Sequence, residues 1–150
     1  MPILKKPEYA SAFTDFIQRA KSLQAQDLRS KWKWKAGLDG CRAAKRSHKV
    51  MMQSAKARLL KVSLAPNTLE PIHTHKARSV LLILEPTRFS YYDMKKVSKR
   101  EWAKMRDRLP DVHEPSSIGA YTIPPEEPHA MMNLDRDKKY VALRLEIGKV

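Results

Sequence analysis

The spacing of apolar residues divides the chain into a helical first part and a second part built of strands. Between Glu8 and about Arg29, after Pro7, apolar side chains recur every three or four residues, at Tyr9, Phe13, Phe16, Ile17, Ala20 and Leu23. This spacing predicts an amphipathic helix with the proline in its first turn. From His48 onward the period falls to two, as where Tyr140, Ala142, Arg144 and Glu146 alternate with Val141, Leu143, Leu145 and Ile147. Such alternation predicts half-buried strands.

Turn-forming residues separate these strands. Ala65-Pro66-Asn67 and Pro124-Pro125 are two examples, and many short strands with such punctuation predict a β-sandwich or barrel. One interruption is helical, because Ser98 and Glu101 form a capping box and are followed at helical spacing by Trp102, Met105 and Leu109. The patterns therefore predict a mainly β fold with an N-terminal helix and a short inserted helix.

Length and composition fit one folded domain with an extension. With 150 residues, of which 42% are hydrophobic and 31% charged, the chain is long enough to bury a core. The change of period sets the expected boundary, with a basic extension over residues 1–45 and the barrel over residues 46–150. The longest apolar run, Val80 to Leu84, is far shorter than the roughly 20 residues that cross a bilayer, so no transmembrane segment is expected.

Cysteine usage and the N-terminal composition bear on the cellular compartment. Cys41 is the only cysteine, so no intrachain disulfide can form, and we expect an intracellular, reducing environment. The first residues lack the apolar core of a secretory signal. Residues 1–35 are basic and partly amphipathic, as in mitochondrial addresses, but Glu8, Asp15 and Asp27 oppose that interpretation. Cytoplasmic and mitochondrial locations both remain open.

A strong excess of positive charge suggests an anionic partner. Thirty Lys and Arg residues against sixteen Asp and Glu residues give a formal net charge of +14. Lys and Trp alternate over residues 31–35, which suits a phosphate-bearing surface such as RNA or an anionic protein. The candidate anion-binding residues are Lys31, Lys33, Lys35, Arg42, Lys45 and Arg46. The alternative is a solubilising face, with the tryptophans covering an apolar flank of the barrel.

Two of the five histidines are spaced to share a metal ion. His73 and His75 are two residues apart, so in a strand both imidazoles point to the same face, about 7 Å apart along the chain. The segment from Asn67 to His75 resembles the first motif of the cupin family, with Asn67 in place of the motif's glycine. The family's glutamate ligand is missing, because Ser79 and Val80 stand at the matching positions; its closing glycine is replaced by Pro86 or Thr87.

A later segment resembles the second cupin motif. It begins at Gly119, reaches Pro124 one residue early, has Glu126 in place of a glycine, and then has His129 and Asn133 at the family's spacing. The resemblance covers about residues 46–150. It implies the cupin double-stranded β-helix, or jelly-roll barrel, in which His73, His75 and His129 would bind one metal. It also implies pairing of two copies, to which the N-terminal helix could contribute.

Three neutral imidazoles without a carboxylate still suit a divalent transition metal. Fe, Zn, Ni, Cu and Mn are all compatible with such a set, which leaves open positions for a substrate. Some cupin dioxygenases resemble this three-histidine arrangement. Glu85 and Glu146 are possible replacement carboxylates in apparently distal positions, His113 could close over the site, and His48 has no assigned role. The sequence has no glycine-rich phosphate loop, so no nucleotide cofactor is expected.

Two functions from different classes follow. The first is a metal-binding small cupin acting as an oxygenase or isomerase. Arg78 or Arg144 would orient an anionic small molecule in a pocket that also holds Tyr91, Tyr121 and Asn133. The second is a noncatalytic cupin that serves as a basic scaffold subunit of a ribonucleoprotein or another large complex. Whether the protein is an enzyme is left open by the sequence.

Overall fold

The computed structural model describes residues 7–24, 32–94, 100 and 117–148. Its helices are α1 (Pro7–Gln24), the 3-10 helix η2 (Ala36–Leu38) and α2 (Gly40–Ala43). Its strands are β1 (His48–Gln53), β2 (Ala57–Leu64), β3 (His73–His75), β4 (Arg78–Glu85), β5 (Phe89–Asp93), β6 (Gly119–Ile123), β7 (Glu126–Asn133) and β8 (Tyr140–Ile147). The expected inserted helix and His113 lie outside the described residues. No described helix is long and apolar enough to span a membrane.

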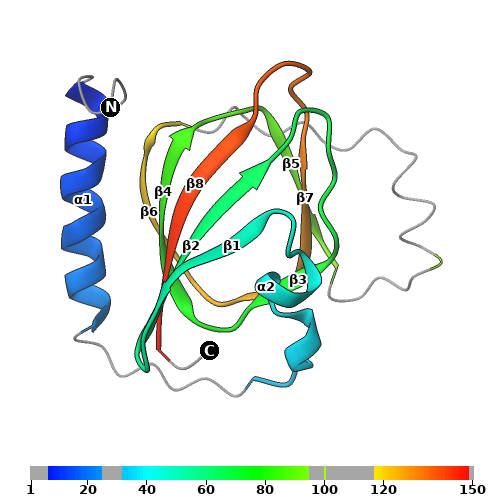
Figure 1. The fold of residues 1–150 in the computed structure, drawn as a ribbon, viewed down its shortest axis with the longest axis horizontal. Coiled ribbons are helices and arrows are strands. Elements are labelled where there is room, and N and C mark those ends of the chain that lie inside the picture. The colour runs from blue at the N-terminus through cyan, green and yellow to red at the C-terminus, as the bar shows by residue number, and fades with distance from the viewer. Residues whose placement is uncertain (1–6, 25–31, 95–99, 101–116, 149–150) are drawn as a thin grey trace.

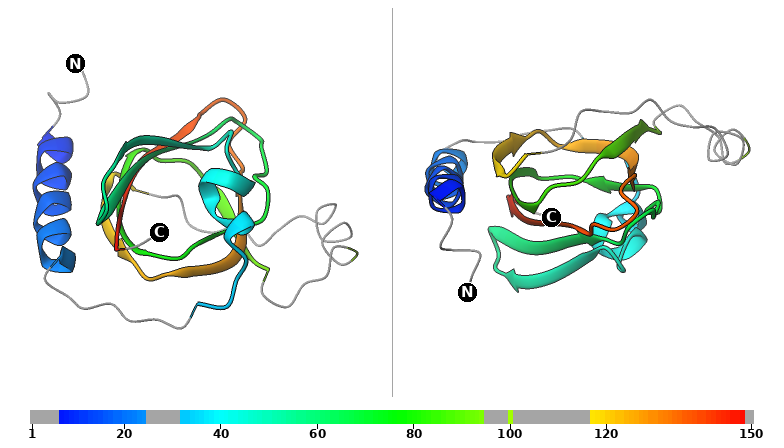
Figure 2. Two further views of the ribbon diagram at one scale, coloured as in Figure 1. Left: turned by 60° about the horizontal axis from the view of Figure 1, so that its bottom comes forward. Right: turned by 90° about the horizontal axis from the view of Figure 1, so that it is seen from above.

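The strands form two antiparallel sheets that enclose a barrel. One sheet has the order β1-β2-β8-β4-β6, and the other has the order β3-β7-β5. Consecutive strands frequently lie in different sheets, so the chain winds back and forth around the barrel, as Figures 1 and 2 show. This arrangement is the jelly roll, and the expected mainly β fold with an N-terminal helix is confirmed.

Helix α1 packs on the outside of the larger sheet (Figure 1). Its buried face consists of Ala12, Phe16, Ala20 and Leu23, which contact apolar residues of β4, β6 and β8. Burial of a side chain such as Phe16 contributes about 1.5–3 kcal/mol. The Tyr9 hydroxyl donates a hydrogen bond to the Leu84 carbonyl at 2.9 Å. The barrel is therefore the surface that this face of the helix covers, while Phe13 and Ile17 remain exposed.

Helix α1 also explains the orientation of β8. The apolar residues Leu143 and Leu145 face outward and pack against the core cluster beneath the helix. The alternate set points into the barrel, where Arg144 is 5% exposed and Glu146 is fully buried. The interior of this strand is therefore its more polar side, which places charged groups where a functional site can form.

Candidate metal centre

Four imidazoles meet inside one end of the barrel. His73 and His75 come from β3, and His129 lies on the neighbouring strand β7, directly opposite His73. The ring centroids are 4.3 Å apart for His73 and His129, 5.0 Å for His73 and His75, and 5.6 Å for His75 and His129. All three residues are at most 4% exposed. The structure therefore brings the three expected histidines together.

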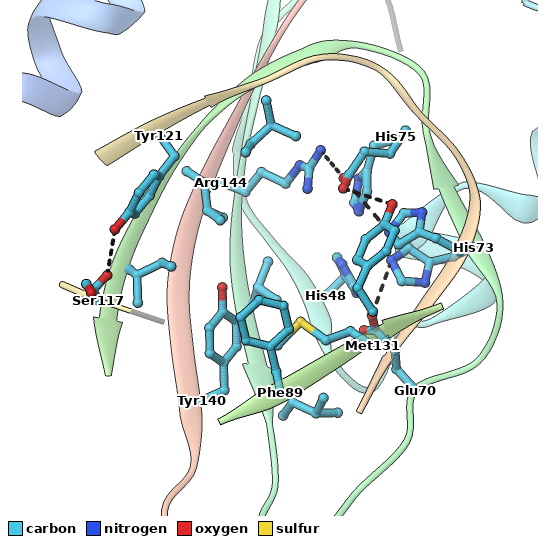
Figure 3. A pocket seen from close by; sticks show the side chains of 18 residues that line it. His48, Glu70, His73, His75, Phe89, Ser117, Tyr121, Met131, Tyr140 and Arg144 are labelled. Carbon is cyan, nitrogen blue, oxygen red and sulfur yellow. Dashed lines mark hydrogen bonds and ion pairs between the residues drawn. The ribbon is translucent and has the colours of Figure 1, made fainter. Parts of the chain in front are cut away.

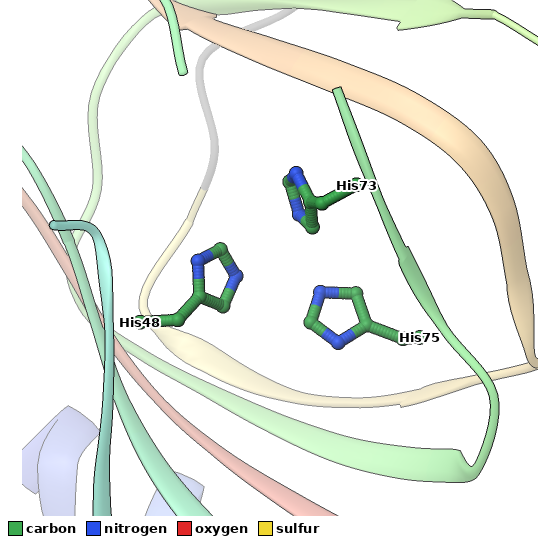
Figure 4. A group of neighbouring side chains, drawn as sticks. All are labelled: His48, His73 and His75. Carbon is green, nitrogen blue, oxygen red and sulfur yellow. The ribbon is translucent and has the colours of Figure 1, made fainter. Parts of the chain in front are cut away.

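The fourth imidazole is that of His48, for which the sequence pattern predicts no role. It is the first residue of β1, and its ring centroid lies 4.6 Å from that of His73 and 5.1 Å from that of His75 (Figure 4). Strand β1 pairs with β2 and belongs to the other sheet from β3. No spacing in the sequence joins His48 to the His73 segment, because their proximity arises across the barrel.

Each of the four rings has an acceptor at Nδ1. Three of these acceptors are backbone carbonyls: Pro71 for His73 at 2.9 Å, Glu127 for His129 at 2.8 Å and Ala44 for His48 at 3.2 Å. The fourth is the Glu146 carboxylate, 2.8 Å from Nδ1 of His75. A carbonyl or carboxylate can only accept, so these partners assign the hydrogen of His73, His75 and His129 to Nδ1 and leave a lone pair on Nε2 of each. Nδ1 of His48 also lies 2.9 Å from the Ser47 hydroxyl, which can either donate or accept, so its partners do not select one tautomer. Metal-binding histidines are usually oriented in this way.

Burial keeps these imidazoles neutral. Loss of solvent lowers the pKa of His48 to about 3 and that of His73 to about 2. The same cause, followed by the positive charge of Arg144, holds the pKa of His75 well below its usual range. The pKa of His129 is also lowered by burial. All four rings are therefore unprotonated at neutral pH, the state in which imidazole binds a metal.

Two carboxylates face the cluster. An oxygen of Glu70 lies 3.7 Å from Nε2 of His73, and an oxygen of Glu126 lies 3.8 Å from Nε2 of His129. Burial raises the pKa of Glu70 to about 8. Burial also acts to raise the pKa of Glu126, but the combined effect of Arg144, His129 and His73 lowers it. Three donor sets have ligand atoms within 4.8 Å of one another: His48, His73 and His75; Glu70, His73 and His129; and His75, Glu126 and His129.

These carboxylates were not found from the sequence as members of the site. Glu70 precedes His73 by three residues, and Glu126 was noted only as a substitute for a glycine. Of the two replacement carboxylates that were considered, Glu85 is exposed at the end of β4. Glu146 is close to the cluster after all, but it reaches the outer nitrogen of His75. Its place is behind the ring, as an orienting group.

A chain of charged groups continues from Glu146 toward the surface. The second oxygen of Glu146 accepts a hydrogen bond from Nε of Arg58 at 2.6 Å. The same guanidinium donates to both oxygens of Asp39, at 2.8 and 3.1 Å. Asp39 also caps α2 by accepting from the backbone N–H of Cys41. This network ties the segment before β1 to His75, so that the end of the barrel and the histidine cluster form one unit.

Gly40 lies directly against the imidazoles. A Cβ atom at this position would be 2.9 Å from the His75 ring, 3.2 Å from His48 and 3.3 Å from His73. We expect Gly40→Ala to displace at least one ring and to weaken metal binding at least tenfold, because ligand rings must be held within about 0.5 Å of their positions. A Cβ at Gly37 would meet nothing within 4 Å, so Gly37→Ala is the matched control. Equal metal affinity in both variants, measured by competition with a chelating dye, would show that this packing is unimportant.

The cluster opens into a cavity of about 410 Å³ (Figure 3). Of the pocket residues expected from the sequence, Tyr91, Tyr121 and Arg144 line it. The ring of Tyr91 stacks on His129, with centroids 5.1 Å apart and an angle of 11°. Arg78 and Asn133 are not among the lining residues. The buried Asn133 amide instead donates to the carbonyls of Leu64, Ala65 and Lys138, which makes it a structural anchor for two loops.

The expected anion-binding residues lie on the outer surface. Lys31 is outside the described residues, whereas Lys33, Lys35, Arg42, Lys45 and Arg46 are all exposed. Lys33 places its Nζ 5.0 Å from the centre of the Trp34 ring. A second, more polar groove of about 540 Å³ is lined in part by Trp32, Trp34, Lys35, Arg42 and Lys76. This groove is distinct from the histidine cavity. Arg58 and Asp39, which connect to His75 through Glu146, line the groove and not the cavity.

Comparison with known proteins concerns the fold. No family model matches the sequence, and a search of curated proteins found no match. Among solved structures, a cupin domain from Bordetella pertussis Tohama I is 16% identical, with a TM-score of 0.48 over 67% of this chain and 90% of the other. An RmlC-like cupin family protein from Methanocaldococcus jannaschii is 10% identical, with a TM-score of 0.45 and coverages of 83% and 94%.

A third similar structure is an enzyme. The polyketide cyclase RemF from Streptomyces resistomycificus is 18% identical, with a TM-score of 0.46 over 79% of this chain and 80% of the other. The two antiparallel sheets and their strand order define the class of the present chain as a small protein with the jelly-roll fold, to which these cupin structures are similar.

Proposed function

We propose that the protein binds one divalent transition metal through His73, His75 and His129, with His48 as a further imidazole, and acts on a small molecule in the adjoining cavity. The observation that carries this proposal is the orientation of the four rings. All four are buried and neutral, and the Nδ1 acceptors of His73, His75 and His129 leave each of these three rings a lone pair on Nε2.

The donor set fits a transition metal better than a hard cation. Imidazole nitrogen suits Zn, Fe, Cu, Ni or Mn, whereas Mg and Ca prefer all-oxygen sites. Glu70 shares a donor group with His73 and His129, and Glu126 shares one with His75 and His129. Among the described residues no such group holds His73, His75 and His129 together, so a shared ion would require a small shift of the rings. A bound metal would supply Lewis-acid or redox chemistry at the inner end of the cavity. The protein residues would orient the substrate there and exclude water, and oxygenation and isomerisation are the two reaction classes we propose.

Metal content tests this proposal. Protein purified without added chelator is expected to contain about one transition-metal ion per chain, and His73→Ala is expected to lose it, since removal of one ligand weakens a metal site strongly. Lys76→Ala is the control, because Lys76 follows the same short strand but is exposed. Metal-free wild-type protein that takes up no Zn²⁺, Fe²⁺, Ni²⁺, Cu²⁺ or Mn²⁺ on titration would refute the proposal. Retention of the ion by His73→Ala would refute the assigned ligands.

A second candidate function is supported by the outer groove. Trp32 and Trp34 are half-buried there beside Lys35, Arg42 and Lys76, a combination that suits stacking on bases and contact with phosphates. In this alternative the protein is a noncatalytic subunit of a ribonucleoprotein. Single-stranded RNA should then bind with an affinity that falls steeply with salt and that Trp34→Ala weakens. Equal RNA affinity of the wild type and Trp34→Ala would show that the groove is not the RNA-binding site.

A further inference from the structure

The cavity beside the histidines has two ends of different chemistry. The imidazoles, Glu70 and Glu126 occupy the inner end. The remaining walls are mostly apolar side chains from both sheets: Val62, Leu64, Leu81, Ile83, Phe89 and Met131. Figure 3 shows Tyr121 and Ser117 on the side of the cavity away from His73 and His75, with Phe89 and Tyr140 between. A molecule in this space would place its polar part at the histidines and its apolar part along the barrel.

The one cationic side chain on the described cavity walls already forms an ion pair with a carboxylate. Arg144 is the only Lys or Arg among the described lining residues. Its Nη2 lies 2.7 Å from the Glu126 carboxylate, and its Nε donates to the Ser79 hydroxyl at 2.9 Å. An anion would have to compete with Glu126 for this buried guanidinium, at the cost of leaving a carboxylate unpaired. The other described lysines and arginines therefore do not line this cavity, which does not share their positive charge.

Aromatic rings line the path to the histidines. Phe89 and Tyr91 come from β5, Tyr121 from β6 and Tyr140 from β8. The Tyr91 ring stacks on the His129 ring, so an aromatic face borders the histidines, and such a wall suits a flat ring in a bound molecule. The Tyr140 side chain is 5% exposed, and no described residue makes a hydrogen bond with its hydroxyl. This hydroxyl points into the cavity in Figure 3 and can donate to an oxygen of a bound molecule.

We propose that the substrate is an uncharged, largely apolar molecule that contains an aromatic ring and carries one or two oxygen atoms directed toward the histidines. This inference rests on the proposed function where it assigns a role to the metal. The affinity of the cavity for an apolar ring does not depend on that proposal. The cavity volume of about 410 Å³ falls within the range of roughly 300–1,000 Å³ for small-molecule sites. Burial of an apolar ring against these walls supplies binding energy with or without a metal.

A pair of probes with the same two fused rings tests the substrate class. Isothermal titration calorimetry should show that the neutral 1-naphthol binds metal-free protein at least tenfold more tightly than the anionic 1-naphthoate. Preference for 1-naphthoate, or no binding of 1-naphthol, would overturn the inference. The proposed function is judged separately, by metal content: metal binding without 1-naphthol binding would refute only the substrate class, and the reverse result would refute only the metal site.

A charge placed on the cavity wall tests the location of binding. Ile123 lines the cavity from β6, whereas Val141 is a half-buried residue of β8 that does not line it. Ile123→Lys should weaken 1-naphthol binding at least tenfold, and Val141→Lys should leave it unchanged. If Ile123→Lys does not fold, Phe89→Ala serves instead, because it removes an aromatic wall without adding a charge. Unchanged binding in a folded variant of either cavity residue would contradict the assignment.

Discussion

Replacing Glu146 by Leu is expected to destabilise the protein by about 3–5 kcal/mol, the usual cost of removing one partner from a buried ion pair. Glu146 is fully buried and joins two groups, the Arg58 guanidinium at 2.6 Å and Nδ1 of His75 at 2.8 Å. Without the carboxylate, Arg58 retains only Asp39, and the His75 ring loses its orienting acceptor. Metal affinity should fall about 10–100-fold, as for other losses of a group that orients a ligand.

Two further variants separate charge from geometry. Glu146→Gln keeps an oxygen that can accept from His75, so it should lose less metal affinity than Glu146→Leu. Glu85→Leu is the matched control, because Glu85 is an exposed carboxylate at the end of β4. Chemical denaturation gives the free energy of unfolding of each variant. If Glu146→Leu matched Glu85→Leu in both stability and metal affinity, the chain of contacts from Asp39 to His75 would have no energetic role.

Acid is expected to destabilise the metal-free protein steeply below about pH 6.5. Burial holds the pKa of His48 at about 3 and that of His73 at about 2, while unfolded histidine takes up a proton near its ordinary value of 6.5. His75 and His129 are shifted in the same direction. Between these values the unfolded chain binds more protons than the folded one, so stability falls as pH falls.

Two carboxyl groups oppose this trend. Burial raises the pKa of Glu70 to about 8 and also raises that of Glu146, so each of these groups stabilises the folded state as pH falls toward 4.5. The four histidines outnumber these two carboxyls, and the lowered pKa of Glu126 acts in the same direction as the histidines, so stability falls as pH falls from 6.5 to 4.5. Urea unfolding at pH 7 and 5.5, in the presence of a chelator, measures this slope. His48→Gln should reduce it, and a slope near zero in the wild type would contradict neutral buried imidazoles.

Much of the fold could be predicted because periodicity reports which residues share a face. The helical spacing before residue 29 and the alternation along β8 both correspond to elements of the structure. Periodicity does not reveal which face of a strand points inward. In β8 the apolar face is covered by α1, so Arg144 and Glu146 fill the interior, and a sequence pattern alone would favour the opposite orientation.

The candidate site was predictable only where its members share a motif. His73 and His75 are neighbours along one strand, and His129 has the spacing of the second cupin motif. His48 lies on β1 in the opposite sheet, and its approach to these rings depends on how the barrel closes. Arg78 and Arg144 were equivalent candidates in the sequence. Side chains alternate between the two faces of a strand, and Arg78 is three positions from Leu81 and five from Ile83, which line the cavity. Arg78 therefore lies on the opposite face of β4.

The protonation of the histidine rings tests the central claim most directly. Two-dimensional ¹H–¹⁵N NMR through long-range couplings distinguishes a ring protonated at Nδ1 from one protonated at Nε2. In metal-free protein at pH 7, the rings of His48, His73, His75 and His129 should all be neutral, and those of His73, His75 and His129 should carry hydrogen on Nδ1. One equivalent of Zn²⁺ should then shift the Nε2 resonances of His73, His75 and His129. Hydrogen on Nε2 of any of these three rings, or Nε2 resonances that Zn²⁺ leaves unchanged, would contradict a shared metal site.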